Sequence, residues 1–173
     1  PSNLRFSYAM ANYARGVAHA AKGQWAEAQA ALDSVTAINA ATPQDAEGKT
    51  ALSIAVYALS GEIATRRGDF DAATNHFRKA AKIEDGGLYF EPPKWYYPIR
   101  HSLGIALLKA GHHAEAENAY REDLRRFPEN GWSLFGLAQA LRAQGKNTEA
   151  AAAEERFRRA WASTDVTLTA SRF

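Results

Sequence analysis

The 173-residue sequence contains no cysteine and a single methionine. The lack of cysteine excludes disulfide bonds, thiolate metal sites and a cysteine nucleophile, and it fits either a cytoplasmic or a periplasmic location. No apolar run approaches the roughly 20 residues that a membrane-spanning helix requires, and no segment has the pattern of a signal peptide. We therefore predict a soluble protein without membrane insertion, and the compartment stays open.

Sequence motifs that support catalysis are also lacking. The chain has no HExxH, no GxSxG and no glycine-rich phosphate-binding loop, and none of its five histidines has a convincing catalytic or metal-binding partner in the sequence. We expect no enzyme activity, no catalytic residues, no metal and no cofactor. The 21 basic and 19 acidic side chains are mixed in both halves of the chain. Because nucleic-acid binding requires clustered basic residues, we expect no nucleic-acid partner.

One local pattern occurs four times in the chain, and it predicts helices joined in pairs. A helical stretch is followed by a glycine, at Gly23, Gly68, Gly111 and Gly145, and then by an alanine-rich helix. Glycine favours the left-handed backbone conformation that ends a helix, so each of these positions predicts a tight turn. Small residues precede each turn by seven positions (Gly16, Gly61, Gly104, Ala138) and follow it by five (Ala28, Ala73, Ala116, Ala150). We therefore predict an all-α fold in which paired helices approach closely.

The third copy shows the pattern most clearly, with Leu103 and Gly104 before the turn and Ala116, Tyr120 and Pro128 after it. This pattern resembles the tetratricopeptide repeat. The resemblance implies a right-handed α-solenoid of antiparallel helical hairpins, with about four repeats in a single domain over residues 1–173. We place the repeats at 4–39, 49–83, 97–128 and 130–162. Since the chain begins at Pro1, we interpret it as a fragment of a larger bacterial-type protein.

The predicted elements are eight helices and an extended C-terminal tail. The helices are placed at 4–22, 25–39, 49–67, 70–83, 97–110, 113–126, 130–144 and 147–162. In the tail, 163–173, Val166, Leu168 and Ala170 alternate with polar residues, which indicates an extended segment. We expect the tail to lie along the last helix pair and cover apolar surface, or else to dock elsewhere on the parent protein or on a second copy.

In the repeat family the first helix of each pair lines a concave groove, so the resemblance implies a scaffold that binds a protein or peptide there. Residues one turn apart on these helices become the predicted contacts. The partner-binding residues are Tyr13, His101, Trp132, Phe135, Gln139 and Arg142. Arg142 is suited to a peptide carboxylate, because a guanidinium group can pair with it through two hydrogen bonds.

Residues 89–100, YFEPPKWYYPIR, contain five aromatic residues and three prolines. One interpretation is that these rings fill the groove between repeats two and three. In another, the aromatic loop 89–101 forms a pocket for a small molecule, with Tyr89, Trp95, Tyr96 and Arg100 at the rim of the groove or in this pocket. A third function, self-association through the end repeats and the tail, is also left open.

Overall fold

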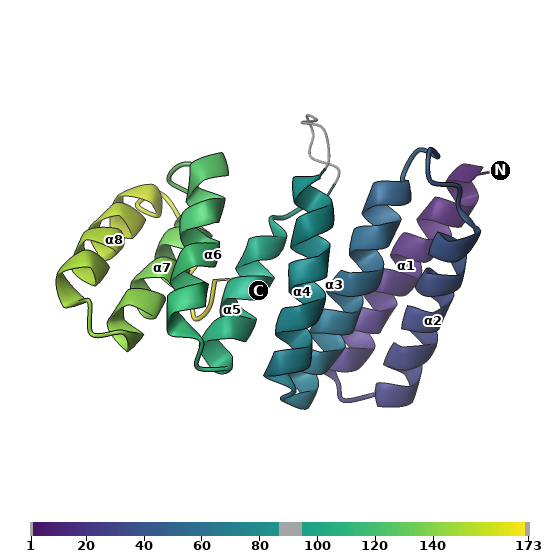
Figure 1. Cartoon of the computed structure of the whole chain (residues 1–173), viewed down its shortest axis with the longest axis horizontal. Coiled ribbons are helices and arrows are strands. Elements are labelled where there is room, and N and C mark those ends of the chain that lie inside the picture. Colours follow the sequence, from purple (N-terminus) through teal and green to yellow (C-terminus); the bar gives the residue numbers. More distant parts are fainter. Residues whose placement is uncertain (1, 87–94, 172–173) are drawn as a thin grey trace. The chain divides into compact units, whose positions relative to one another are not determined.

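The computed structural model describes residues 2–86 and 95–171, and these residues form eight helices and no strand (Figure 1). The helices are α1 (Ser2–Ala21), α2 (Trp25–Ala41), α3 (Lys49–Arg67), α4 (Phe70–Asp85), α5 (Ile99–Lys109), α6 (His113–Arg126), α7 (Gly131–Ala143) and α8 (Asn147–Ala160). No predicted boundary differs from these by more than two residues. The predicted all-α fold of helical hairpins is confirmed.

The chain divides into two compact units, residues 1–99 and 100–173. In the first unit, α1 packs against α2 and α3, and α3 packs against α4. In the second unit, α7 packs against both α6 and α8. The single domain expected over residues 1–173 stays a prediction.

Each hairpin turns at one of the predicted glycines. Gly68, after α3, has a φ of 80°, and its N–H donates to the carbonyl oxygens of Ala64 and Thr65. No atom lies within 4 Å of the position that a Cβ would occupy there, so backbone conformation rather than space requires glycine. The same positive φ recurs at Gly23, Gly111 and Gly145.

In the second and third hairpins, the glycine seven residues ahead of the turn leaves room for a large ring from the second helix. A Cβ on Gly61 would lie 2.7 Å from the Phe77 ring, and a Cβ on Gly104 would lie 2.2 Å from the Tyr120 ring. Both rings are completely buried. In these two hairpins the helices approach closely, as predicted, with an aromatic ring against the glycine, whereas a Cβ on Gly16 would lie 2.6 Å from the Leu59 side chain and 3.2 Å from the Cβ of Ala31.

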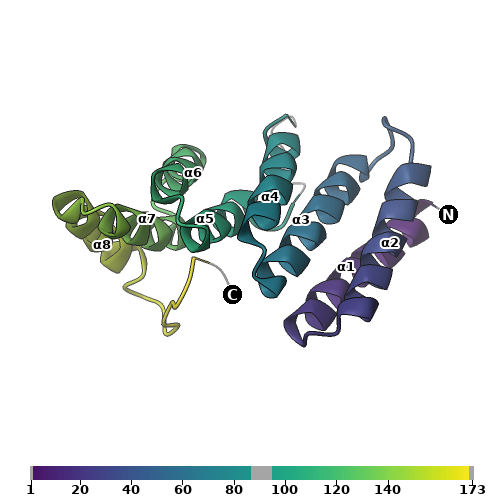
Figure 2. The same cartoon turned by 60° about the horizontal axis from the view of Figure 1, so that its bottom comes forward.

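The tail leaves α8 without regular structure and turns back toward the preceding repeat. Figure 2 shows it, in yellow, running along the side of α7 and α5 that lies away from α6. The Ser171 hydroxyl lies 2.6 Å from the hydroxyl of Tyr120 on α6 and 3.4 Å from the carbonyl oxygen of His101 on α5. The tail does cover helix surface, as expected, but Ser171 lies on α5 and α6 rather than along the last helix pair.

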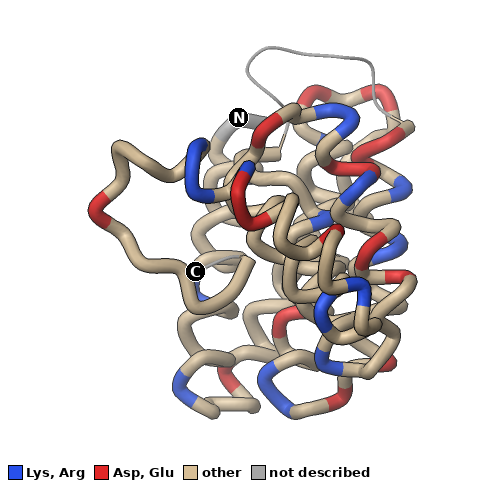
Figure 3. The backbone as a smooth tube through the Cα atoms, turned by 90° about the vertical axis from the view of Figure 1, so that its left-hand side faces the viewer, with Lys and Arg blue, Asp and Glu red and all other residues tan. Residues whose placement is uncertain are grey.

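Basic and acidic residues are interspersed along the backbone (Figure 3). None of the described helices combines the length and the apolar character that a membrane span requires.

Candidate protein-binding site

Four aromatic rings join the inner faces of α7 and α8. The Trp132 and Trp161 rings meet edge to face, with centroids 5.3 Å apart. Trp161 stacks on Phe157 at 5.7 Å, and Phe157 lies 5.4 Å from Phe135. Because aromatic pairs in these geometries stabilise beyond their buried area, this series of rings strengthens the packing of α7 against α8.

A cavity of about 360 Å³ opens beside Phe135 at one end of this series. We call it the terminal pocket, and its lining residues are Phe135, Ala138, Gln139, Arg142, Glu154, Phe157 and Arg158. Two phenylalanines and an alanine supply apolar surface, while the remaining side chains carry polar or charged groups. Such a pocket can accept an apolar side chain and pair a neighbouring charge.

The charged groups of the terminal pocket are already engaged, yet accessible. Arg142 pairs with Glu154 across the hairpin at 2.5 Å, and the Arg142 side chain is 62% exposed. Arg158 pairs with Glu155, which lies one turn earlier on α8. Exposed ion pairs of this kind contribute little free energy, so an incoming carboxylate can exchange with them at small cost.

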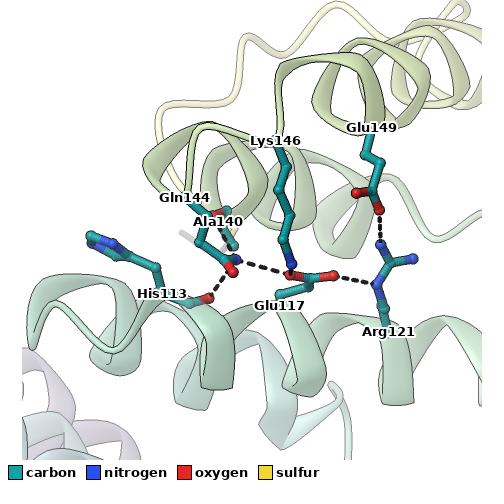
Figure 4. Close-up of polar contacts among 7 residues, drawn as sticks. All are labelled: His113, Glu117, Arg121, Ala140, Gln144, Lys146 and Glu149. Atoms are coloured by element: carbon teal, nitrogen blue, oxygen red, sulfur yellow. Dashed lines mark hydrogen bonds and ion pairs between the residues drawn. The ribbon is translucent and has the colours of Figure 1, made fainter.

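The α7–α8 hairpin is held against α6 by a polar network centred on Glu117 (Figure 4). The Glu117 carboxylate accepts hydrogen bonds from Arg121 at 2.8 Å, Lys146 at 2.7 Å and Gln144 at 2.9 Å. Arg121 continues to Glu149 on α8 at 2.9 Å. The network therefore links α6, the end of α7, the turn and the start of α8.

The same network sets the charge state of Glu117. Burial raises the pKa of its carboxyl group, but the hydrogen bonds from Lys146, Arg121 and Gln144 outweigh burial and lower the pKa to about 2. The group is therefore ionised at neutral pH. Since these partners come from three elements, the negative charge holds the turn between α7 and α8 in place.

The structure brings together the four partner-binding residues that were predicted on α7. Phe135, Gln139 and Arg142 line the terminal pocket, and Trp132 belongs to the series of rings beside it. They share the face of α7 away from α6, because Ser133 and Gln144 are the residues that bond to α6.

His101 lies elsewhere in the second unit and is only 4% exposed. Its Nε2 lies 3.2 Å from a carboxylate oxygen of Asp123, which also accepts a hydrogen bond from the Ser133 hydroxyl. This buried cluster joins α5, α6 and α7. His101 was expected to face a partner on the inner surface, but in this structure its ring is buried among α5, α6 and α7.

Tyr13, in the first unit, is 5% exposed and also presents no open surface. Trp95 covers it edge to face with centroids 5.2 Å apart, and the Tyr96 hydroxyl lies 3.4 Å from the Tyr13 hydroxyl. Burial, together with the neighbouring Tyr97 and Tyr96 hydroxyls, raises the pKa of Tyr13 well above its usual value. Tyr13 thus acts in this structure as the anchor of an aromatic cluster.

The rim residues predicted around the aromatic segment differ in exposure. Trp95 and Arg100 are buried, whereas Tyr96 is 70% exposed. Trp95 and Tyr96 belong to the first unit and Arg100 to the second. Tyr89 lies outside the described residues. The rim role of these residues stays a prediction.

Sequence reasoning missed the half of the terminal pocket that α8 supplies. Glu154 and Arg158 belong to a mixed-charge stretch that is typical of a solvated helix face. One signal was available in the sequence. Intervals of seven and four residues separate Ala150, Phe157 and Trp161, and this spacing places all three on one side of a helix.

Comparison with known proteins decides the family. A model described as tetratricopeptide repeat matches residues 101–163, and a second with the same description matches residues 9–34. The chain belongs to the tetratricopeptide repeat family. The human tetratricopeptide repeat protein 7A is 28% identical over 107 residues, or 62% of this chain. The chain spans only 11% of that relative's length.

Solved structures of MamA are similar to this tetratricopeptide repeat chain in fold. One MamA structure gives a TM-score of 0.55 at 15% identity and covers 94% of this chain and 98% of its own. A second, MamA AMB-1, gives 0.55 at 17% identity and covers 91% of this chain and 94% of its own. At these identities the likeness shows an all-helical repeat fold.

Family membership supports a protein-interaction or scaffold module, and tetratricopeptide repeat proteins are generally non-enzymatic scaffolds. Among the described residues, no group of three or more His, Asp or Glu side chains is arranged to hold a metal ion.

Proposed function

We propose that this tetratricopeptide repeat chain is a protein-binding module and that the terminal pocket is its contact site. The observation that supports the proposal most directly is the convergence of Phe135, Gln139 and Arg142 on one cavity. The series of rings and the Glu117 network hold the two helices of this cavity in place. A preorganised site loses little conformational entropy on binding, which favours affinity.

The position of the pocket favours a helical partner segment. In repeat arrays each hairpin buries one face against the preceding hairpin and offers the other to the next. Ser133 of α7 and Gln144, just after it, bond to α6, so Phe135 and Arg142 lie on the opposite face of α7, beside α8, where a partner helix would cover the pocket. An amphipathic helix recognised in this way inserts anchors one turn apart.

The chemistry of the pocket specifies the partner further. Its apolar part, formed by Phe135 and Phe157, suits a leucine or an aromatic anchor. Arg142 and Arg158 suit an acidic residue one turn away from that anchor on the partner helix. We therefore expect a partner helix that carries an apolar anchor and a nearby carboxylate.

The test is a pull-down with three forms of the full chain. The pocket variant carries Phe135→Asp and Arg142→Glu. The matched control carries Phe127→Asp and Arg156→Glu, which make the same chemical changes outside the pocket, at an exposed phenylalanine and at an arginine paired with Glu129. Circular dichroism must first show equal helicity in all three forms.

A protein that is retained by the wild type and the control, and lost by the pocket variant, is the expected result. Equal capture by all three forms would refute the terminal pocket as the contact site. A small-molecule site at the aromatic segment and self-association stay predictions, and sedimentation velocity over a concentration series tests the latter.

A further inference from the structure

A second part of the surface is occupied by the chain's own tail. Ser171 is completely buried and Leu168 nearly so, while Val166 is 45% exposed and residues 163–165 are exposed. The Trp161 indole N–H donates to the Val166 carbonyl oxygen at 2.7 Å. The described part of the tail is therefore held at two points, Val166 and Ser171, and most of its side chains face solvent.

Ser171 is anchored by Tyr120, whose ring extends from α6 and passes between α5 and α7. A Cβ placed on Gly104 of α5 or on Gly136 of α7 would lie 2.2 Å from the ring. Only glycine at both positions leaves space for Tyr120 to pass. Its hydroxyl consequently reaches the far side of α5 and α7, where it meets the Ser171 hydroxyl at 2.6 Å.

These contacts have the character of peptide recognition. Two side chains three residues apart, Leu168 and Ser171, are buried, and Thr169 between them is exposed. The Ser171 hydroxyl is placed by two groups of the helices, the Tyr120 hydroxyl and the His101 carbonyl oxygen. An extended segment with a few anchors and otherwise solvated residues opens locally at low free energy.

We propose that the surface around Gly104, Gly136 and the Tyr120 hydroxyl is a second binding site, which we call the tail cradle. It accepts an extended peptide in which an apolar residue is followed, three positions later, by serine. In the free chain the tail occupies the cradle and acts as an intramolecular competitor. This site is separate from the terminal pocket. The proposal rests on the proposed protein-binding function in one respect, namely that a partner protein exists.

Competition by the tail sets the condition for binding. A short linker keeps an attached segment at an effective concentration on the order of millimolar, so a free peptide of similar sequence competes poorly. A partner must therefore bind more tightly than the tail, or the tail must be released first. Exposure of the cradle, and therefore binding of a partner, depends on whether residues 163–171 are docked or released.

The experiment uses the full chain and a fluorescent synthetic peptide, TDVTLTAS, which has the sequence of residues 164–171. The release variant carries Leu168→Asp and Ser171→Asp. The control carries Thr164→Asp and Val166→Asp, which add the same charge at exposed positions of the tail. Fluorescence polarisation reports binding, and NMR chemical shifts of residues 164–171 report release.

We expect the release variant to bind the peptide at least tenfold more tightly than the wild type or the control. Adding Tyr120→Phe to the release variant should weaken binding about three- to tenfold, because one hydrogen bond is lost. A helical release variant that does not bind the peptide, or a wild type that binds it equally well, would overturn the proposal.

A second measurement applies even if the release variant does not fold. Excess peptide added to the wild-type chain should move the NMR chemical shifts of its own tail toward random-coil values, and unchanged shifts at millimolar peptide would also overturn the proposal. The outcome is distinguishable from failure of the terminal pocket, because Phe135→Asp with Arg142→Glu should leave peptide binding to the release variant unchanged.

Discussion

Replacing Gly136 by alanine should destabilise the chain, although alanine is the better helix former. The Cβ would lie 2.2 Å from the Tyr120 ring, which is completely buried and confined on its other side by Gly104. Overpacking of this kind costs up to about 3 kcal/mol. The higher helix propensity of alanine returns about 1 kcal/mol. We therefore expect a net loss of about 2 kcal/mol in the free energy of unfolding.

For a chain of this length, that loss corresponds to a Tm lower by roughly 4–8 °C. Urea unfolding followed by circular dichroism measures the free energy directly. The matched control is Gly86→Ala, where φ is −75° and the nearest atom lies 3.5 Å from the added Cβ. That substitution should stabilise by up to about 1 kcal/mol, because it restricts the unfolded chain.

A double-mutant cycle assigns the effect to the ring. In a Tyr120→Leu background the space beside Gly136 is no longer occupied by an aromatic ring, so Gly136→Ala should become neutral or slightly stabilising. The reasoning is refuted if Gly136→Ala leaves the wild-type stability unchanged, or if its cost is the same with and without Tyr120.

Two further predictions concern the second unit. Glu117→Gln should lower the free energy of unfolding most at neutral pH. The pKa of the Glu117 carboxyl group is lowered from 4.5 to about 2. Its carboxylate therefore stabilises the fold above pH 4.5, and this stabilisation is lost as the pH falls toward 2. Urea unfolding at pH 7 and pH 3 checks this, and a difference between the two proteins that does not shrink at pH 3 contradicts it. Asn130→Ala should cost about 1 kcal/mol, because the Asn130 side chain accepts hydrogen bonds from the N–H groups of Trp132 and Ser133 at the start of α7. Asn130→Asp, which retains an acceptor, is its control in the same unfolding assay, and equal losses in the two variants would argue against the cap.

The hairpins could be predicted from sequence because their signals are local. A glycine such as Gly68 or Gly111 must occupy the left-handed region at the end of a helix, whatever packs around it. The helices between these turns follow from composition and spacing, and their bounds agree with the structure to within two residues.

The candidate site was predictable only in part. Phe135, Gln139 and Arg142 recur at helical spacing on one helix, so their shared face can be read from the chain. Whether a residue on that kind of face is open depends on what covers it. Tyr13 and His101 fit the same periodic argument, yet one is covered by Trp95 and the other is enclosed by its bond to Asp123.

The sequence by itself determined the all-helical repeat architecture, the turn positions and the family. Only the tertiary structure decided that α8 completes the terminal pocket, that Tyr120 passes between Gly104 and Gly136, and that Ser171 of the tail lies against the Tyr120 hydroxyl. The physical reason is the distance along the chain. Helix and turn preferences act over a few residues, whereas the contact of Ser171 with Tyr120 joins groups 51 residues apart and depends on how three helices pack.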